Sequence, residues 1–132
     1  MFDLAAITEL QSSKLKVTHP ETGALVGAEI ELASANHPKR KQCEFNHSRA
    51  LRAKVAKKGR LQLTDPQDDA DYEIDHLVAC TLSWTGFARD GKPIECTPGE
   101  IRAVYESAAW LRDQATEFLR DSANFLQSTK SI

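Results

Sequence analysis

The stretch TPGEIRAVYESA at residues 97–108 decides the fold of this chain more than any other. It opens with a capping box, in which the side chains of Thr97 and Glu100 each satisfy a backbone amide of the first helical turn. Pro98 follows the cap and already has the φ angle that a helix needs. Behind it, apolar residues recur at helical spacing: Ile101, Val104, Tyr105 and Ala108. The stretch therefore predicts an amphipathic helix that buries one face.

The sequence on the C-terminal side predicts one more helix. This helix starts near Trp110, and the stripe that it is expected to bury is Leu111, Ala115, Phe118, Leu119, Ser122, Phe125 and Leu126. Residues 128–132 are expected to fray, as chain ends commonly do.

On the N-terminal side, another helix start lies at residues 65–68 (DPQD), which supply an N-cap, a proline and acids. The helix is expected to run to about Trp84, with a buried stripe of Ile74, Leu77, Val78 and Thr81. Beyond it, Asp90 and Gly91 form a two-residue turn signal between short apolar flanks. A short hairpin is therefore predicted near residues 85–96.

The first part of the chain predicts a β-hairpin followed by a polar helix. Apolar and polar residues alternate at 14–19 and at 27–33, on the two sides of a HPETG turn at 19–23. Pro38 then opens a long helix over 38–57, which ends in lysines before a glycine. Residues 1–12 are expected to form an N-terminal arm.

Together these elements predict an α+β fold that is mainly helical, with a small N-terminal hairpin packed on about four helices. The 132 residues fit a single domain over 1–132. Apolar runs of only a few residues exclude a membrane-spanning helix, and the acidic N-terminus does not resemble a signal peptide. Three cysteines without CxxC spacing indicate reduced thiols in the cytoplasm.

Charges are segregated along the sequence. Between residues 37 and 60 lie Lys39, Arg40, Lys41, Arg49, Arg52, Lys54, Lys57, Lys58 and Arg60, opposed only by Glu44. The acids Asp65, Asp68, Asp69, Asp71, Glu73 and Asp75 follow at once. They would cancel much of the field that attracts a phosphate backbone, and the basic stretch offers base stacking only Phe45. We therefore expect a solvated face or an acidic protein partner rather than nucleic acid.

One pattern has the residue types of a zinc site. Cys43 and His47 lie one helical turn apart, and so do His76 and Cys80 on the next predicted helix. This spacing differs from that of common zinc modules, and Cys80 lies in an apolar run where a buried thiol is ordinary. We expect no functional metal and no cofactor.

Catalytic motifs are missing from the sequence. There is no G-x-S-x-G, P-loop or dinucleotide fingerprint, and carboxylates such as Asp68 and Asp69 are explained by a helix start. We expect that the chain is not an enzyme and has no catalytic residues.

Aromatic residues near turns suggest how the chain could bind another protein. Trp84, Phe87 and Trp110 fit either the core or an apolar anchor of an interface. Arg49 and Arg52 lie on the polar helix and would form a charged rim. These five side chains are the candidate protein-binding residues.

The order of the motifs resembles a known family over residues 14–126. The matching pieces are P-x-T-G at 20–23, a Lys/Arg-rich helix, a helix with an acidic start that ends in W-x-G at 84–86, DGKP at 90–93, T-x-x-E at 97–100, Tyr105, WL-x-x-Q at 110–114 and NF at 124–125. Together they look like the tail assembly chaperones of bacteriophages with long, flexible, non-contractile tails.

The resemblance implies a small, largely helical protein that is made late in infection. Such chaperones bind the tape-measure protein, keep its long helices soluble and help recruit tail-tube subunits. They act in the host cell cytoplasm and are absent from the mature virion. Many are also made in a longer, frameshifted form, and the family has no catalytic residues. The resemblance leaves open whether this chain forms a homo-oligomer.

A small DNA-binding protein of the helix-turn-helix kind is the alternative, because two predicted helices follow in quick succession from Thr97. The second helix argues against it, since its charges are mixed: Arg112, Asp113, Glu117, Arg120 and Asp121. A small enzyme is the third and least supported interpretation.

Overall fold

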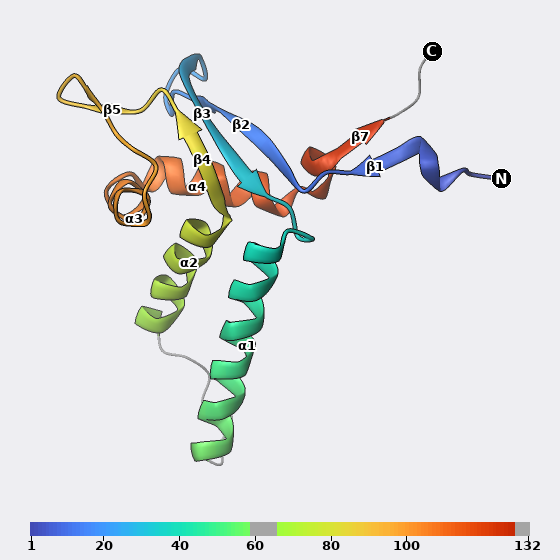
Figure 1. The fold of residues 1–132 in the computed structure, drawn as a ribbon. Coiled ribbons are helices and arrows are strands. Elements are labelled where there is room, and N and C mark those ends of the chain that lie inside the picture. The colour runs from blue at the N-terminus through green and yellow to red at the C-terminus, as the bar shows by residue number, and fades with distance from the viewer. Residues whose placement is uncertain (59–65, 129–132) are drawn as a thin grey trace.

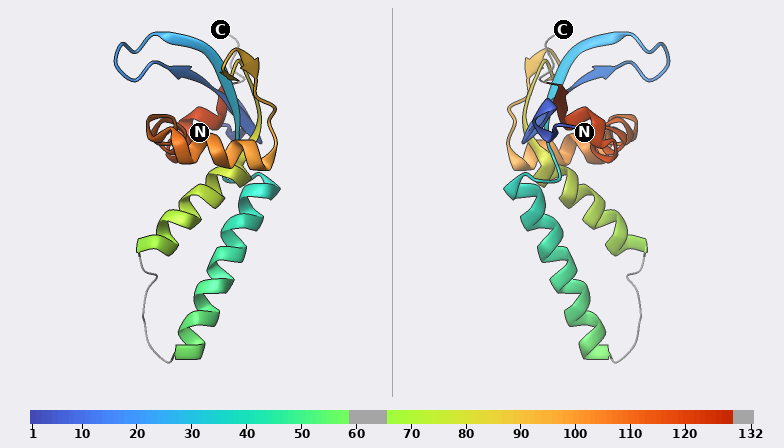
Figure 2. Two further views of the ribbon diagram at one scale, coloured as in Figure 1. Left: turned by 90° about the vertical axis from the view of Figure 1, so that its left-hand side faces the viewer. Right: turned by 90° about the vertical axis from the view of Figure 1, so that its right-hand side faces the viewer.

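The computed structural model describes residues 1–58 and 66–128. It has the expected α+β architecture, with more helix than strand (Figure 1). A three-stranded sheet lies against helices α3 (Pro98–Ser107) and α4 (Ala109–Arg120), while α1 (Pro38–Lys58) and α2 (Pro66–Cys80) extend away from it (Figure 2).

The predicted N-terminal hairpin is confirmed and forms two strands of this sheet. The strands are β2 (Ser12–Thr18), β3 (Leu25–Ala33) and β4 (Thr81–Thr85), in the antiparallel order β2-β3-β4. The central strand alternates as a half-buried strand should, with Ala28, Ile30 and Leu32 buried. At the turn end, the Gln114 side chain of α4 donates to the carbonyl of Thr18 (2.7 Å) and accepts from its amide (3.1 Å).

The predicted helix over 66–84 is too long, because α2 ends at Cys80 and the next residues form β4. Thr81 lies four residues after Leu77, so its buried position fits a helical stripe as well as a strand. Pairing decides between them: Thr81–Thr85, rich in residues that favour strands, bonds to β3 with Trp84 opposite Ile30. The Thr81 hydroxyl donates to the Leu77 carbonyl at 2.8 Å, which ties the last turn of α2 to the strand.

The predicted helix from Trp110 to residue 126 is also too long. Helix α4 ends at Arg120, and Asp121 caps a short 3-10 helix, η2 (Ser122–Phe125). Phe125 remains buried, with its ring edge-to-face with Phe118 at 5.4 Å between centroids. The helical spacing therefore predicted the burial of Phe125 correctly, but Ser122 and Leu126 of the predicted stripe are exposed, and the backbone conformation differs from the predicted one.

The N-terminal arm over residues 1–12 contains regular structure. It holds the 3-10 helix η1 (Leu4–Ala6) and β1 (Ile7–Glu9), which pairs antiparallel with β7 (Leu126–Ser128) (Figure 1). Ser128, the first of the residues expected to fray, lies opposite Ile7 in this ribbon. Residues 129–132 lie outside the described residues.

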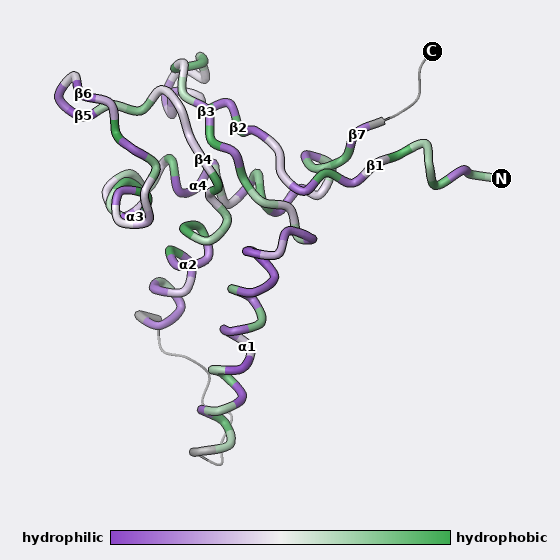
Figure 3. The backbone as a smooth tube through the Cα atoms, in the orientation of Figure 1, coloured by the Kyte–Doolittle hydropathy of each residue, from purple (hydrophilic) through white to green (hydrophobic). Residues whose placement is uncertain are grey.

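The polar helix over 38–57 is confirmed as α1, which reaches Lys58. Hydrophilic and hydrophobic residues are mixed along its whole length (Figure 3). The glycine cap at 59 and the N-cap at Asp65 lie outside the described residues. The second hairpin is confirmed as β5 (Ala88–Arg89) and β6 (Lys92–Pro93), joined by Asp90 and Gly91 with φ of 54° and 78°.

Half of the predicted capping box is present at the start of α3. The Thr97 hydroxyl accepts from the Glu100 amide at 3.4 Å, as expected. The Glu100 carboxylate instead accepts from Arg89 of the second hairpin at 3.2 Å. Helix α3 thus begins at the predicted residue and is also joined to β5.

The buried side chains form one cluster between the sheet, α2, α3 and α4. Its largest fully buried members are Tyr105, Ile30, Leu32, Leu77 and Leu111. The Thr81 hydroxyl uses its hydrogen in the bond to the Leu77 carbonyl, so in its 2.8 Å contact with Tyr105 the Tyr105 hydroxyl is the donor. Both hydroxyls therefore have hydrogen-bond partners within the core. None of the helices in the described part of the chain has the length and apolar character to cross a membrane.

Glu31 predicts an acid-dependent loss of stability. Its carboxylate on β3 accepts from Ser12 of β2 (2.7 Å) and from Ser83 of β4 (3.1 Å), and these bonds lower its pKa. A lowered folded pKa stabilises the fold above the unfolded pKa, and this stabilisation is lost as the pH falls through the folded pKa. We expect Glu31→Gln to lose less stability than the wild type between pH 6 and pH 3 in urea titrations. Glu29→Gln on the same strand is the control, and equal pH dependence in all three proteins would contradict the prediction.

Candidate protein-binding site

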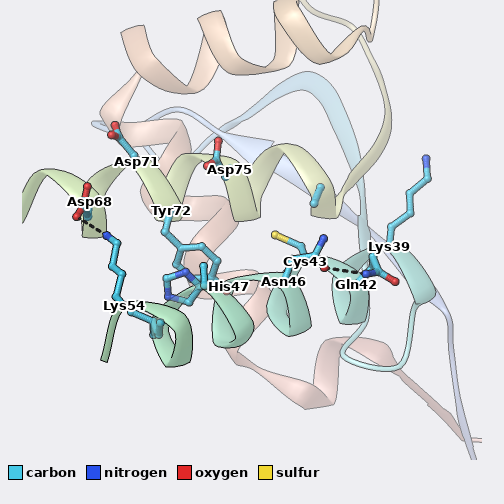
Figure 4. A pocket seen from close by; sticks show the side chains of 13 residues that line it. Lys39, Gln42, Cys43, Asn46, His47, Lys54, Asp68, Asp71, Tyr72 and Asp75 are labelled. Atoms are coloured by element: carbon cyan, nitrogen blue, oxygen red, sulfur yellow. Dashed lines mark hydrogen bonds and ion pairs between the residues drawn. The ribbon is translucent and has the colours of Figure 1, made fainter. Parts of the chain in front are cut away.

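An open groove of about 660 Å³ lies between α1 and α2 (Figure 4). We call it the hairpin groove, and its lining is Lys39, Gln42, Cys43, Asn46, His47, Ala50, Leu51, Lys54, Asp68, Asp71, Tyr72, Asp75 and Ala79. The α1 positions recur at three- and four-residue steps, so they share one helix face. The half-buried members are mostly apolar or aromatic, and the exposed ones are mostly polar.

An aromatic contact joins the two helices inside the groove. Tyr72 of α2 points toward α1 and stacks on His47, with 3.5 Å between the ring centroids and 11° between the planes (Figure 4). His76, one turn further along α2, has its ring centroid 5.6 Å from that of Tyr72. Burial raises the pKa of Tyr72 to about 12, so its hydroxyl is neutral at physiological pH.

A network of charged side chains holds the first turns of α1 to the rest of the fold. The Arg40 guanidinium donates to the carbonyls of Ala33 (3.1 Å) and Leu119 (3.4 Å) and to the Glu44 carboxylate (3.2 Å). His76 Nε2 lies 2.8 Å from the same carboxylate. Burial raises the pKa of Glu44, but the bonds from His76 and Arg40 lower it more, so the net shift is downward. Arg40 therefore holds α1 to β3 and α4, and the ionised Glu44 carboxylate holds α1 to α2.

The two walls of the groove carry opposite charges. Lys39 and Lys54 stand on the α1 wall, near its base and its tip respectively (Figure 4). The acids of the α2 wall are Asp68, Asp71 and Asp75. Lys54 and Asp68 form an ion pair across the tip at 3.0 Å, and Asp75 pairs with Arg102 of α3. An apolar strip therefore runs between a basic edge and an acidic edge.

Three residues of the zinc pattern make other contacts, and the fourth, Cys43, lines the groove. His47 stacks on Tyr72, and His76 bonds to Glu44. Cys80 is buried, with Sγ 3.7 Å from His76 Nε2, and burial raises its pKa to about 12. Over residues 1–58 and 66–128, no group of three or more His, Cys, Asp and Glu side chains is placed to hold a metal ion.

The structure separates the five predicted binding residues. Trp84 is 7% exposed and lies in the core, while half-buried Phe87 packs edge-to-face on it at 5.0 Å. Trp110 is 39% exposed at the start of α4. Arg49 lies over the exposed Phe45 ring at 5.7 Å, and Arg52 is exposed on the same helix. None of the five lines the hairpin groove.

Sequence reasoning missed Tyr72 and Leu51, which lie in the groove. The one-turn spacing of Cys43 and His47, weighed above only as the pattern of a zinc site, places both residues on the α1 face that lines the groove. The charge segregation between the two helices is the second signal, because it gives the groove its two edges.

Comparisons with protein-family models, with curated proteins and with solved structures give no match for this chain. The function is therefore argued from the groove and from the sequence pattern.

Proposed function

We propose that this chain is a tail assembly chaperone of phages with long, flexible tails. It binds the tape-measure protein, keeps it soluble and helps recruit tail-tube subunits. The observation that carries the proposal is the hairpin groove, an apolar strip with charged edges on two helices that extend from the body. A groove of this kind suits the apolar face of an amphipathic helix.

The chemistry of a tape-measure protein fits such a groove. Before the tube encloses them, its long helices expose apolar stripes that associate unless another protein covers them. Tyr72 and Leu51 would contact the stripe, and the charged edges would orient the helix and steer its approach. We place this activity in the host cytoplasm, with the chaperone released before the virion is complete, and we assign it no catalytic step.

The surface of α4 gives little support to the alternative, a DNA-binding helix-turn-helix. Leu111, Ala115 and Leu119 of the second helix are buried against the sheet and neighbouring helices. Arg112 donates to the Tyr105 carbonyl at 2.9 Å, so this cation holds α3 to α4. The exposed residues around it include the acids Asp113 and Glu117, which would repel phosphate.

Co-expression with a tape-measure protein encoded beside this chain tests the proposal. We expect the client to be soluble with the wild-type chain and insoluble without it. Ala50→Arg places a long charged side chain in the groove and should lose this effect. Ala53→Arg is the matched control, because Ala53 is exposed on α1 but does not line the groove. The readout is the soluble fraction of the client and its co-purification with the chain.

Reversing Arg49 and Arg52 to Glu is a further arm of the same experiment. These exposed cations of α1 lie outside the groove, so the variant should slow association and change its salt dependence with little effect on folding. If every neighbouring tail protein stays insoluble or unbound with the wild-type chain, the chaperone proposal is wrong.

A further inference from the structure

We propose that, without a client, the hairpin groove is covered by a second copy of this chain. The two helical hairpins would lie face to face, with α1 of each copy over α2 of the other. The client's identity plays no part in this inference, which concerns the free protein and follows from the charges of the two helices.

The charges of α1 and α2 are complementary in a way that two copies can use. Along α1, Glu44 is the only acid among many cations, whereas α2 has five acids and no Lys or Arg. A face-to-face pair that set α1 on α1 would bring like charges together, which is destabilising. Setting α1 on α2 instead places a basic wall against an acidic wall twice, related by a two-fold axis.

Near the tip, the opposite charges of α1 and α2 also lie at the same level along the two helices. Lys54 and Asp68 are both near the tip, as their 3.0 Å ion pair shows. With the two hairpins parallel, Lys54 of one copy approaches Asp68 and Asp71 of the other. Asp75 lies further from the tip, beside His76, and Lys39 at the start of α1 adds positive charge to the wall that faces it.

Apolar burial adds to this contact. Leu51, Tyr72, Cys43 and Ala79 are half-buried in the free chain and would become covered, as in the core of a four-helix bundle. This apolar strip is short, and exposed ion pairs contribute little each. The dimer should therefore be weak, with a Kd in the micromolar range, and it should weaken as salt screens the charges.

Sedimentation of the purified full chain tests the inference directly. At low salt we expect a monomer–dimer equilibrium over about 1–500 µM, with the Kd rising about tenfold or more between 50 mM and 500 mM salt. A monomer throughout this range at low salt would overturn the inference. Species that grow beyond a dimer would overturn it as well, because a two-fold contact closes on itself.

A charge exchange identifies the contact. The double variants Lys39→Glu with Lys54→Glu, and Asp71→Lys with Asp75→Lys, should each be monomeric, since like charges then face one another. Mixed together, they should form a heterodimer at least as tight as the wild type. Lys41→Glu with Lys92→Glu changes the net charge equally at exposed positions outside the groove and should dimerise like the wild type.

Circular dichroism melts show whether each variant is folded. If the folded variants dimerise alone, or fail to combine, the face-to-face arrangement is wrong. The co-expression result is separate, because a chain that is monomeric by itself can still hold a client. If the client displaces the second copy, Ala50→Arg should lose both dimer formation and client solubilisation, and Ala53→Arg should keep both.

Discussion

Replacing Trp84 by alanine is expected to destabilise the fold by about 3–5 kcal/mol, as large-to-small changes in a core do. Trp84 is 7% exposed, lies opposite Ile30 in the sheet and packs against Phe87. Its indole N–H donates to the Ile94 carbonyl at 3.0 Å, so the variant also loses a hydrogen bond. Urea unfolding followed by circular dichroism measures the change.

Trp110→Ala is the matched control for this variant. Its side chain is 39% exposed at the start of α4, so less apolar surface returns to water, and we expect a smaller loss than for Trp84→Ala. The comparison separates stability from binding. A normal melting temperature for Trp84→Ala, together with lost client binding, would make Trp84 an anchor and contradict its place in the core.

Gly86→Ala should destabilise the fold by about 3 kcal/mol or more, because two penalties act together. Gly86 has φ of +85°, a conformation that side chains other than glycine rarely adopt. A Cβ built there would also lie 2.4 Å from the carbonyl oxygen of Gly27 and 2.9 Å from the Ala28 Cα. Since both are backbone atoms of β3, the strand itself must move.

Substitutions of two other glycines separate the cost of a positive φ from the cost of the steric clash. Gly23 has φ of +75° with nothing within 4 Å of a built Cβ, so Gly23→Ala should lose only the conformational term of about 1–2 kcal/mol. Gly99 lies in the first turn of α3 with open space around it, and Gly99→Ala should be neutral or stabilise by up to about 1 kcal/mol. Equal losses for Gly86→Ala and Gly23→Ala would contradict the close approach of Gly86 to β3.

Local signals predicted the elements whose conformation is set within a few residues. The Thr97 cap, the turn at Asp90 and Gly91 and the first hairpin all belong to this class. The two wrong boundaries lie where a distant strand decides. Residues 81–85 join β3, and residues 126–128 join β1, so neither outcome follows from local periodicity.

The groove could not be predicted from the sequence for a related reason. It depends on the position of α2 beside α1, which is held by the Glu44–His76 contact, the Tyr72–His47 stack and the Lys54–Asp68 ion pair rather than by a continuous apolar stripe on α1. Tyr72 stands among acids in the sequence, and only the fold shows it stacked on His47. The segregation of basic and acidic residues is visible in the sequence. Only the fold shows that the cations of α1 and the acids of α2 form the two edges of one groove.

The pairing of β1 with β7 must follow the formation of other elements when the chain folds during synthesis. It joins residues 7–9 to residues 126–128, so translation supplies β7 long after β1. The sheet and α3 can form around Tyr105 before then, because all of their residues precede β7 in the sequence. Pairing β1 with β7 is therefore a late event, and it closes the longest loop among the strand pairs of the described residues. It brings β1 into the fold only after residues 126–128 have been made.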